Sequence, residues 1–223
     1  TQVRLHIPIQ LAVDQVLLSD LNIRYNNQEY LIQKLRLSAF TENDQLILKS
    51  LSLTAEPLAV DLQGQIGLSD GMPVHLSAQW QAATSEYGLW QASSQIDGKL
   101  QQLQIKHTLA SPFKFNVQGD LNNVMDEPGF KLQGDWQNLT WPLKQKIPQL
   151  SSEQGTFSVA GNLNHYLLKI DTQLSRPDLP NAHLAFLGEG SLDALNIQTL
   201  ELKSSVGDFQ LHGMVSLKDV TAF

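Results

Sequence analysis

The stretch Phe113-Lys-Phe115-Asn-Val117-Gln-Gly119-Asp-Leu121 shows the pattern that decides the fold class of this chain. Apolar and polar residues alternate in it, which is the period of a β-strand with one apolar face. The same alternation recurs over 3–13, 58–68, 72–80, 130–136, 157–163, 166–170 and 209–217. Short turn signals separate many of these runs, at Asn26-Asn27, Asp70-Gly71, Asp97-Gly98, Asn122-Asn123 and Gly207-Asp208. The sequence therefore predicts an all-β antiparallel meander of about fifteen strands, with very little helix.

A unit of the form Leu/Ile-x-x-Leu-x-Leu/Ile also recurs along the chain. It occurs at 18–23, 32–37, 48–53, 100–105 and 192–197. Its opening step of three residues interrupts a pattern of period two. We expect a turn or a β-bulge at each of these steps, because either one changes the phase of the alternation.

A second recurring unit places a glycine among the apolar positions of a strand. Its five copies are centred on Gly64, Gly119, Gly134, Gly161 and Gly213. Glycine on an apolar face relieves crowding where a sheet curls tightly, so we expect these five on the concave side of a long, strongly curved sheet. No amphipathic helix long enough to cover that side is evident in the sequence. The sheet then either folds on itself or stays open as a U-shaped trough with an apolar interior.

Composition limits the environments and partners of the chain. Fifteen Lys and Arg against 22 Asp and Glu leave a formal net charge of −7, which disfavours binding to nucleic acid. The absence of cysteine excludes disulfides and thiolate sites. The chain starts mid-pattern without Met, so we interpret residues 1–223 as one continuous trough fragment of a longer protein, with a loop break at 141–152. An anchor or export signal is expected outside it.

The sequence offers no catalytic or metal-binding constellation. Six histidines stand at 6, 75, 107, 165, 183 and 212, none at metal-ligand spacing, and we expect them on polar faces or strand edges. Trp80, Trp90, Trp136 and Trp141 are expected to fill the apolar side or close its rim. We therefore expect no enzyme activity, no cofactor and no metal.

An open trough would use its apolar lining, whereas a closed fold would bury it as an ordinary core. The lining predicted from the alternation consists of Phe115, Val117, Phe157, Val159, Leu168, Ile170, Leu195, Ile197, Leu211 and Val215. Repetition of one pattern along the chain without a covering helix favours the open trough.

Short words in the second half follow one another in a characteristic order. Residues 134–143 read Gly-Asp-Trp-Gln-Asn-Leu-Thr-Trp-Pro-Leu, and 155–166 contain Gly155, Phe157, Gly161, Leu163 and Tyr166. Pro177, Pro180, Leu187-Gly188-x-Gly190-x-Leu192-x-x-Leu195-x-Ile197 and Gly213-x-Val215 follow. This succession over 134–217 resembles the TamB family, within the wider AsmA-like group. The resemblance implies a periplasmic β-trough (a "β-taco") anchored in the inner membrane by another segment.

The same resemblance implies two kinds of function, which the residues leave open. One is transport of phospholipid between inner and outer membranes, with acyl chains in the hydrophobic groove. The other is a chaperone or scaffold for outer-membrane protein assembly beside a TamA-like barrel partner, which would hold client strands by β-augmentation.

Overall fold

The computed structural model describes residues 10, 12–25, 28–68, 71–85, 87–143 and 147–216. Within these residues the chain forms fourteen β-strands and no helix, which confirms the all-β prediction. Most of the predicted strand over 3–13 and the turn at Asn26-Asn27 lie outside the described residues. The strands are β1 (Ala12–Tyr25), β2 (Gln28–Glu42), β3 (Gln45–Ala55), β4 (Leu58–Gly67), β5 (Pro73–Thr84), β6 (Gly88–Lys99), β7 (Gln102–Ser111), β8 (Lys114–Asn122), β9 (Gly129–Trp141), β10 (Leu150–Asn162), β11 (His165–Arg176), β12 (Leu179–Gly190), β13 (Ala194–Ser204) and β14 (Gly207–Ser216).

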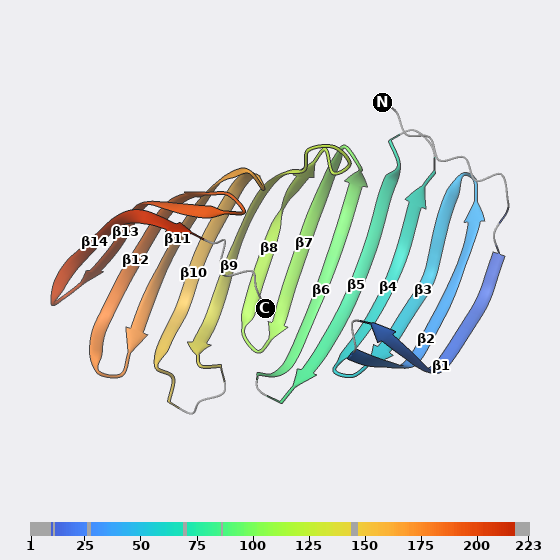
Figure 1. Cartoon of the computed structure of the whole chain (residues 1–223), viewed down its shortest axis with the longest axis horizontal. Coiled ribbons are helices and arrows are strands. Elements are labelled where there is room, and N and C mark those ends of the chain that lie inside the picture. The colour runs from blue at the N-terminus through green and yellow to red at the C-terminus, as the bar shows by residue number, and fades with distance from the viewer. Residues whose placement is uncertain are drawn as a thin grey trace. The chain divides into compact units, whose positions relative to one another are not determined.

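The chain divides into two compact units, Thr1–Pro112 and Phe113–Phe223. Unit 1 contains β1–β7 and unit 2 contains β8–β14, and in each unit every strand pairs antiparallel with its neighbour in sequence (Figure 1). Within unit 2 the strands change direction progressively from steep β8 to nearly horizontal β14 in Figure 1, which is the accumulated twist of an open sheet. The antiparallel meander is confirmed, whereas one continuous trough over 1–223 stays a prediction.

Tight turns connect several of the strands. Between β2 and β3, Asn43 and Asp44 have φ angles of 49° and 55°, the backbone of a two-residue type I′ turn that suits Asn and Asp. Two predicted turn positions are wrong. Asp97-Gly98 lies inside β6, and Gly207-Asp208 begins β14. At Gly98 (φ 128°) a Cβ would collide with the carbonyl oxygen of Gln102 on β7, so this glycine permits close strand approach instead of a turn.

Three of the five three-residue steps coincide with turns or bulges, as predicted. Between Leu48 and Leu51 the register of β3 against β4 shifts, so both leucines stay on one face of the sheet. Leu100 and Leu192 lie in the connections that precede β7 and β13, so there the step marks a turn.

A different arrangement accommodates the steps in β1 and β2. Leu18 pairs with Leu35 and Leu21 pairs with Ile32, so the two strands make the step of three opposite each other. The register does not shift between these pairs, and Asp20, inside the step, has a φ of 53°. The same happens in unit 2, where Asn138 of β9 has a φ of 56° and β9 and β10 keep their register. Asp and Asn tolerate this left-handed backbone better than other non-glycine residues.

In each unit the sheet has one apolar and one polar face, because directly paired residues lie on the same side. The register of unit 1 places one set of side chains, together called the apolar face of unit 1, on a single side: Leu46, Leu48, Leu51, Leu53, Val60, Leu62, Ile66, Val74, Leu76, Trp80, Ala92, Ile96, Leu103, Ile105 and Leu109. The apolar face of unit 2 consists of Phe115, Val117, Leu121, Phe130, Leu132, Trp136, Phe157, Val159, Tyr166, Leu168, Ile170, Leu184, Phe186, Leu195, Ile197, Leu200, Leu202, Phe209, Leu211 and Val215.

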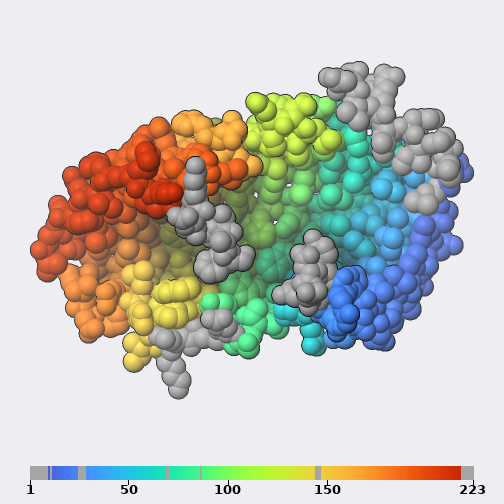
Figure 2. Space-filling model, viewed as in Figure 1, coloured from blue at the N-terminus to red at the C-terminus, as the bar shows by residue number. Residues whose placement is uncertain are grey.

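Few side chains of the apolar faces are fully buried. Among the described residues the buried hydrophobic side chains are Ala39, Leu68, Val74, Ala92, Leu103 and Leu109, all in unit 1. The chain exposes 15291 Å². Two separate compact proteins, each of half the chain's mass, would together expose only about 12,000 Å². In the space-filling view the teal and green strands of unit 1 reach the surface with no second layer of described strands in front of them (Figure 2).

Candidate functional site: the apolar faces

All ten residues predicted as lining lie on the apolar face of unit 2. Cross-strand pairs connect them directly, such as Phe157 with Ile170 and Val159 with Leu168. Further along the sheet Leu195 pairs with Val215. The register therefore brings the predicted set together on one surface, whereas its role as a lipid lining stays a prediction.

None of the ten lining residues is buried. Eight are half-buried, and Leu211 and Val215 on the terminal strand β14 are 41% and 44% exposed. Side chains in a closed core of this size would be fully buried. A half-exposed apolar surface that extends across seven strands can instead contact a flexible apolar ligand.

The five predicted glycines share the apolar faces but differ in why glycine is needed. Gly64, Gly119 and Gly161 have φ angles of 149°, 157° and 140°, and a Cβ on any of them would collide with a carbonyl oxygen of the paired strand. At Gly134 a Cβ would likewise collide with a carbonyl oxygen of the paired strand, that of Asn116, and also with the ring of Phe157, whereas Gly213 has open space around it. Close strand approach thus requires glycine at four of the five positions.

Aromatic rings extend over the apolar face of unit 2. Phe115 and Phe157 stack with ring centroids 5.5 Å apart and planes 6° from parallel, above the β9 strand that lies between them. Phe130 and Tyr166 approach to 6.4 Å across the glycine at 161. The rings cover backbone that the glycines leave bare, which is the known pairing of aromatic residues with sheet glycines.

Two polar groups interrupt the apolar faces, and the sequence analysis predicted neither. In unit 2 the indole N–H of Trp136 donates to Ser152 Oγ at 2.8 Å, and Ser152 Oγ lies 2.7 Å from Thr172 Oγ1. Thr172 donates to the backbone carbonyl of Gln154 at 2.9 Å. Ser152 and Thr172 are only 3% and 5% exposed. As is usual for buried polar groups, each buried side-chain N or O atom of this cluster has a hydrogen-bond partner.

The second interruption is His107 on the apolar face of unit 1. Its Nδ1 lies 2.8 Å from Ser94 Oγ, and its ring stacks on Trp80 with centroids 6.3 Å apart. Burial lowers the pKa of His107 below its ordinary value. The expectation that the histidines occupy polar faces or strand edges is wrong here. His107 follows Leu103 and Ile105 at steps of two residues, so the alternation in the sequence already placed it on the same face as these two side chains.

The opposite faces carry paired polar side chains, across strands or along one strand. His75 lies 2.9 Å from Asp97 in unit 1, and His183 lies 2.9 Å from Asp171 in unit 2. Lys203 lies 2.8 Å from Glu201, and this contact lowers the pKa of Glu201 and raises that of Lys203. Because these pairs are exposed, they favour solubility more than stability.

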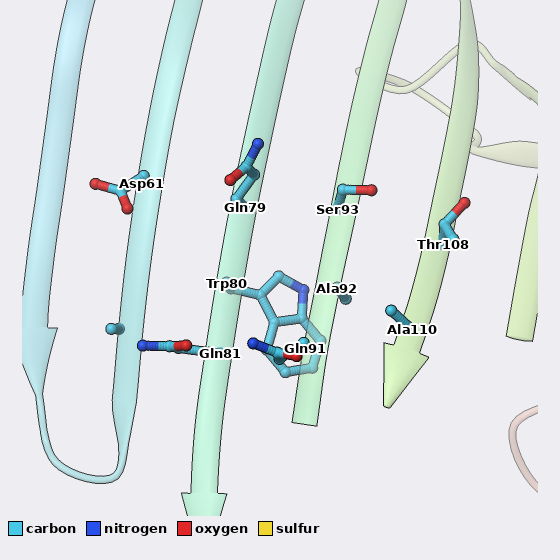
Figure 3. A pocket seen from close by; sticks show the side chains of 10 residues that line it. Asp61, Gln79, Trp80, Gln81, Gln91, Ala92, Ser93, Thr108 and Ala110 are labelled. Carbon is cyan, nitrogen blue, oxygen red and sulfur yellow. The ribbon is translucent and has the colours of Figure 1, made fainter. Parts of the chain in front are cut away.

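A shallow hollow of about 360 Å³ lies on β4–β7 of unit 1 (Figure 3). Its polar lining includes Asp61, Gln79, Gln91, Ser93 and Thr108. Amides and hydroxyls predominate, and the described residues of the chain contain no group of three or more His, Cys, Asp or Glu side chains able to hold a metal ion. The hollow offers amides, hydroxyls and one carboxylate for hydrogen bonding.

No helix that is long and apolar enough to cross a membrane occurs in the part of the chain that the structure describes.

Comparison with known families gives one result that spans the chain. Residues 1–222 match the family described as "TamB, N-terminal domain". Comparison with curated proteins and with solved structures gave no match. The family match extends well beyond the resemblance over 134–217, and it agrees with the all-β meander and its one-sided apolar faces. TamB proteins act in the translocation and assembly module of the cell envelope, where TamA is their partner. The chain belongs to the TamB family.

Proposed function

We propose that this chain carries phospholipid acyl chains along its apolar faces, as a non-enzymatic segment of a protein that connects inner and outer membranes. One observation carries the proposal: the apolar face of unit 2 extends over seven strands, and no lining residue on it is buried. Each methylene group removed from water contributes about 0.8 kcal/mol, so an acyl chain gains from any part of this surface. An apolar surface without deep pockets favours sliding of the acyl chain along it over tight binding at one place.

Family membership supports the setting of this function. TamB proteins belong to the envelope module, so we propose that the chain works in the periplasm, that another segment anchors it in the inner membrane, and that a TamA-like barrel meets the whole protein at the outer membrane. No metal or cofactor enters the proposal, because hydrophobic transfer needs no chemical step.

A photoreactive residue at Val117 tests the proposal in cells. Val117 lies on the apolar face of unit 2, and its neighbour Gln118 lies on the polar face of the same strand, which makes Gln118 a matched control. We expect phospholipid to crosslink at 117 and not at 118. Equal crosslinking at both positions, or none at 117, would contradict the proposal.

The chaperone function has one observation in its favour. Every residue of β14 is exposed, and among the described strands β14 pairs only with β13. Its outer edge offers backbone N–H and C=O groups for an added strand. We expect photoreactive residues in β14, for example at Met214, to capture unfolded outer-membrane proteins if the chain holds clients. Capture there without any lipid at 117 would favour the chaperone.

A further inference from the structure

His107 is unusual because of the face on which it lies. In unit 1 it belongs to a cross-strand row that includes Leu51, Leu62, Ala78 and Ser94. Among the described residues of β3–β7, no other ionisable side chain has a register position on the apolar face of unit 1. The row is otherwise aliphatic except for Ser94. A histidine there is a single polar position in a surface suited to acyl chains.

The contacts of His107 leave one ring nitrogen available. Nδ1 is 2.8 Å from Ser94 Oγ, and the stack on Trp80 fixes the plane of the ring. With Nδ1 accepting from the Ser94 hydroxyl, the neutral ring carries its proton on Nε2. The ring is half-buried, so Nε2 can donate to a group that approaches over the apolar face.

Among the described residues of β4–β7, no charged side chain on this face competes for the His107 ring. The side chains that β4, β5 and β6 place on this face are uncharged, and those in the cross-strand row of His107 are Leu62, Ala78 and Ser94. The nearest charged residues of β6 and β7, Asp97 and Lys106, lie on the opposite face. An anion placed at Nε2 would therefore dominate the electrostatics of the ring and raise its pKa.

We propose that His107, Ser94 and Trp80 bind the phosphate of an anionic phospholipid whose acyl chain lies on the surrounding aliphatic side chains. The site offers hydrogen-bond donors and, after proton uptake, a positive charge, which suits a phosphodiester and does not select a neutral head group. This inference rests on the proposed function, because the acyl chain must occupy the same face. Binding then takes up a proton and strengthens as the pH falls.

The test uses the 223-residue chain with ¹⁵N-labelled histidine and two amphiphiles with the same acyl chain. Lysophosphatidylglycerol carries the phosphate and a monoacylglycerol lacks it. NMR titration should show the pKa of His107 rising by about one unit with the phospholipid and staying unchanged with the neutral lipid. Affinity for the phospholipid should rise up to about tenfold between pH 7.5 and 5.5. His107→Gln should lose this dependence, and His75→Gln on the opposite face should keep it.

The possible results separate this inference from the proposed function. If both amphiphiles bind with the same affinity at every pH, the acyl surface is supported and the phosphate site is wrong. An equal rise in the His107 pKa with inorganic phosphate alone would overturn the lipid assignment in favour of free phosphate. Weaker phospholipid binding at low pH would also overturn it, because the protonated ring would then be a barrier. If neither amphiphile binds at any pH, the proposed function fails together with this site.

Discussion

Trp136 and Gly155 face each other across β9 and β10, and the indole ring occupies the space that a Cβ on residue 155 would need. The same indole donates its N–H to Ser152 on the strand that carries the glycine. One aromatic side chain thus covers bare backbone and satisfies a buried hydroxyl. This pairing accommodates a large ring with a polar N–H on an apolar face.

Gly155→Ala should destabilise unit 2, because the new methyl group collides with the indole of Trp136 and with Thr172. Overpacking of this kind costs about 1–3 kcal/mol. Thermal melts followed by circular dichroism measure the loss. Gly213→Ala is the control, since nothing lies within 4 Å of its Cβ, and it should leave the melting temperature unchanged. Equal effects of the two changes would contradict this account of the glycines.

Gly161→Ala and Gly207→Ala separate backbone strain from collision. Both glycines have φ angles that side chains rarely adopt, 140° and 149°, but only at 161 would a Cβ meet the paired strand. We expect Gly207→Ala to cost about 1 kcal/mol and Gly161→Ala clearly more, as measured by denaturant unfolding. If the two costs are equal, the carbonyl of His165 does not restrict residue 161.

Ser152→Ala should cost about 1–3 kcal/mol, because it leaves the Trp136 N–H and the Thr172 hydroxyl without this buried partner. Ser151→Ala is the matched control on the adjacent residue, whose hydroxyl bonds Ser175 in a half-buried position. Urea unfolding of both variants provides the comparison. A loss no larger at 152 than at 151 would show that the cluster contributes little.

Val159→Asp should leave the chain folded. Val159 is half-buried on the open apolar face, so a carboxylate there can still contact water, and the cost should not exceed about 3 kcal/mol. Ser158→Asp, on the polar face of the same strand, is the control. Circular dichroism checks the fold, and lipid crosslinking at Val117 should fall in Val159→Asp alone. Complete unfolding of Val159→Asp would mean that this face is an ordinary closed core.

The stability of the chain should fall on acidification through His107. Burial lowers its pKa in the folded chain below the value of about 6.5 in the unfolded chain. The folded state then binds fewer protons, so the stability is fully present above the unfolded pKa and declines as the pH drops toward the folded one. Melting temperatures between pH 8 and 5 should decline less in His107→Gln than in the unmutated chain. Parallel declines would show that His107 does not contribute.

The sequence by itself determined the strands, their antiparallel order and the side of each strand that is apolar. Alternation is a local property, so the shared face of Phe157 and Val159 follows from their spacing alone. The three-residue steps could be located in the same way, because a break in the alternation is visible without a structure. His107 was equally readable from its parity with Ile105, although the general rule for histidines pointed elsewhere.

Only the tertiary structure decided which residues of different strands meet. Trp136 contacts Ser152, and Ser152 contacts Thr172, because paired strands place these residues opposite or diagonal to one another. That register depends on bulges and on Asn138 with its φ of 56°, which no alternation pattern specifies. The sequence could not show why each glycine is needed, for the same reason. Gly161 lies against a backbone carbonyl, Gly155 against a ring and Gly213 against open space, and these neighbours belong to other strands.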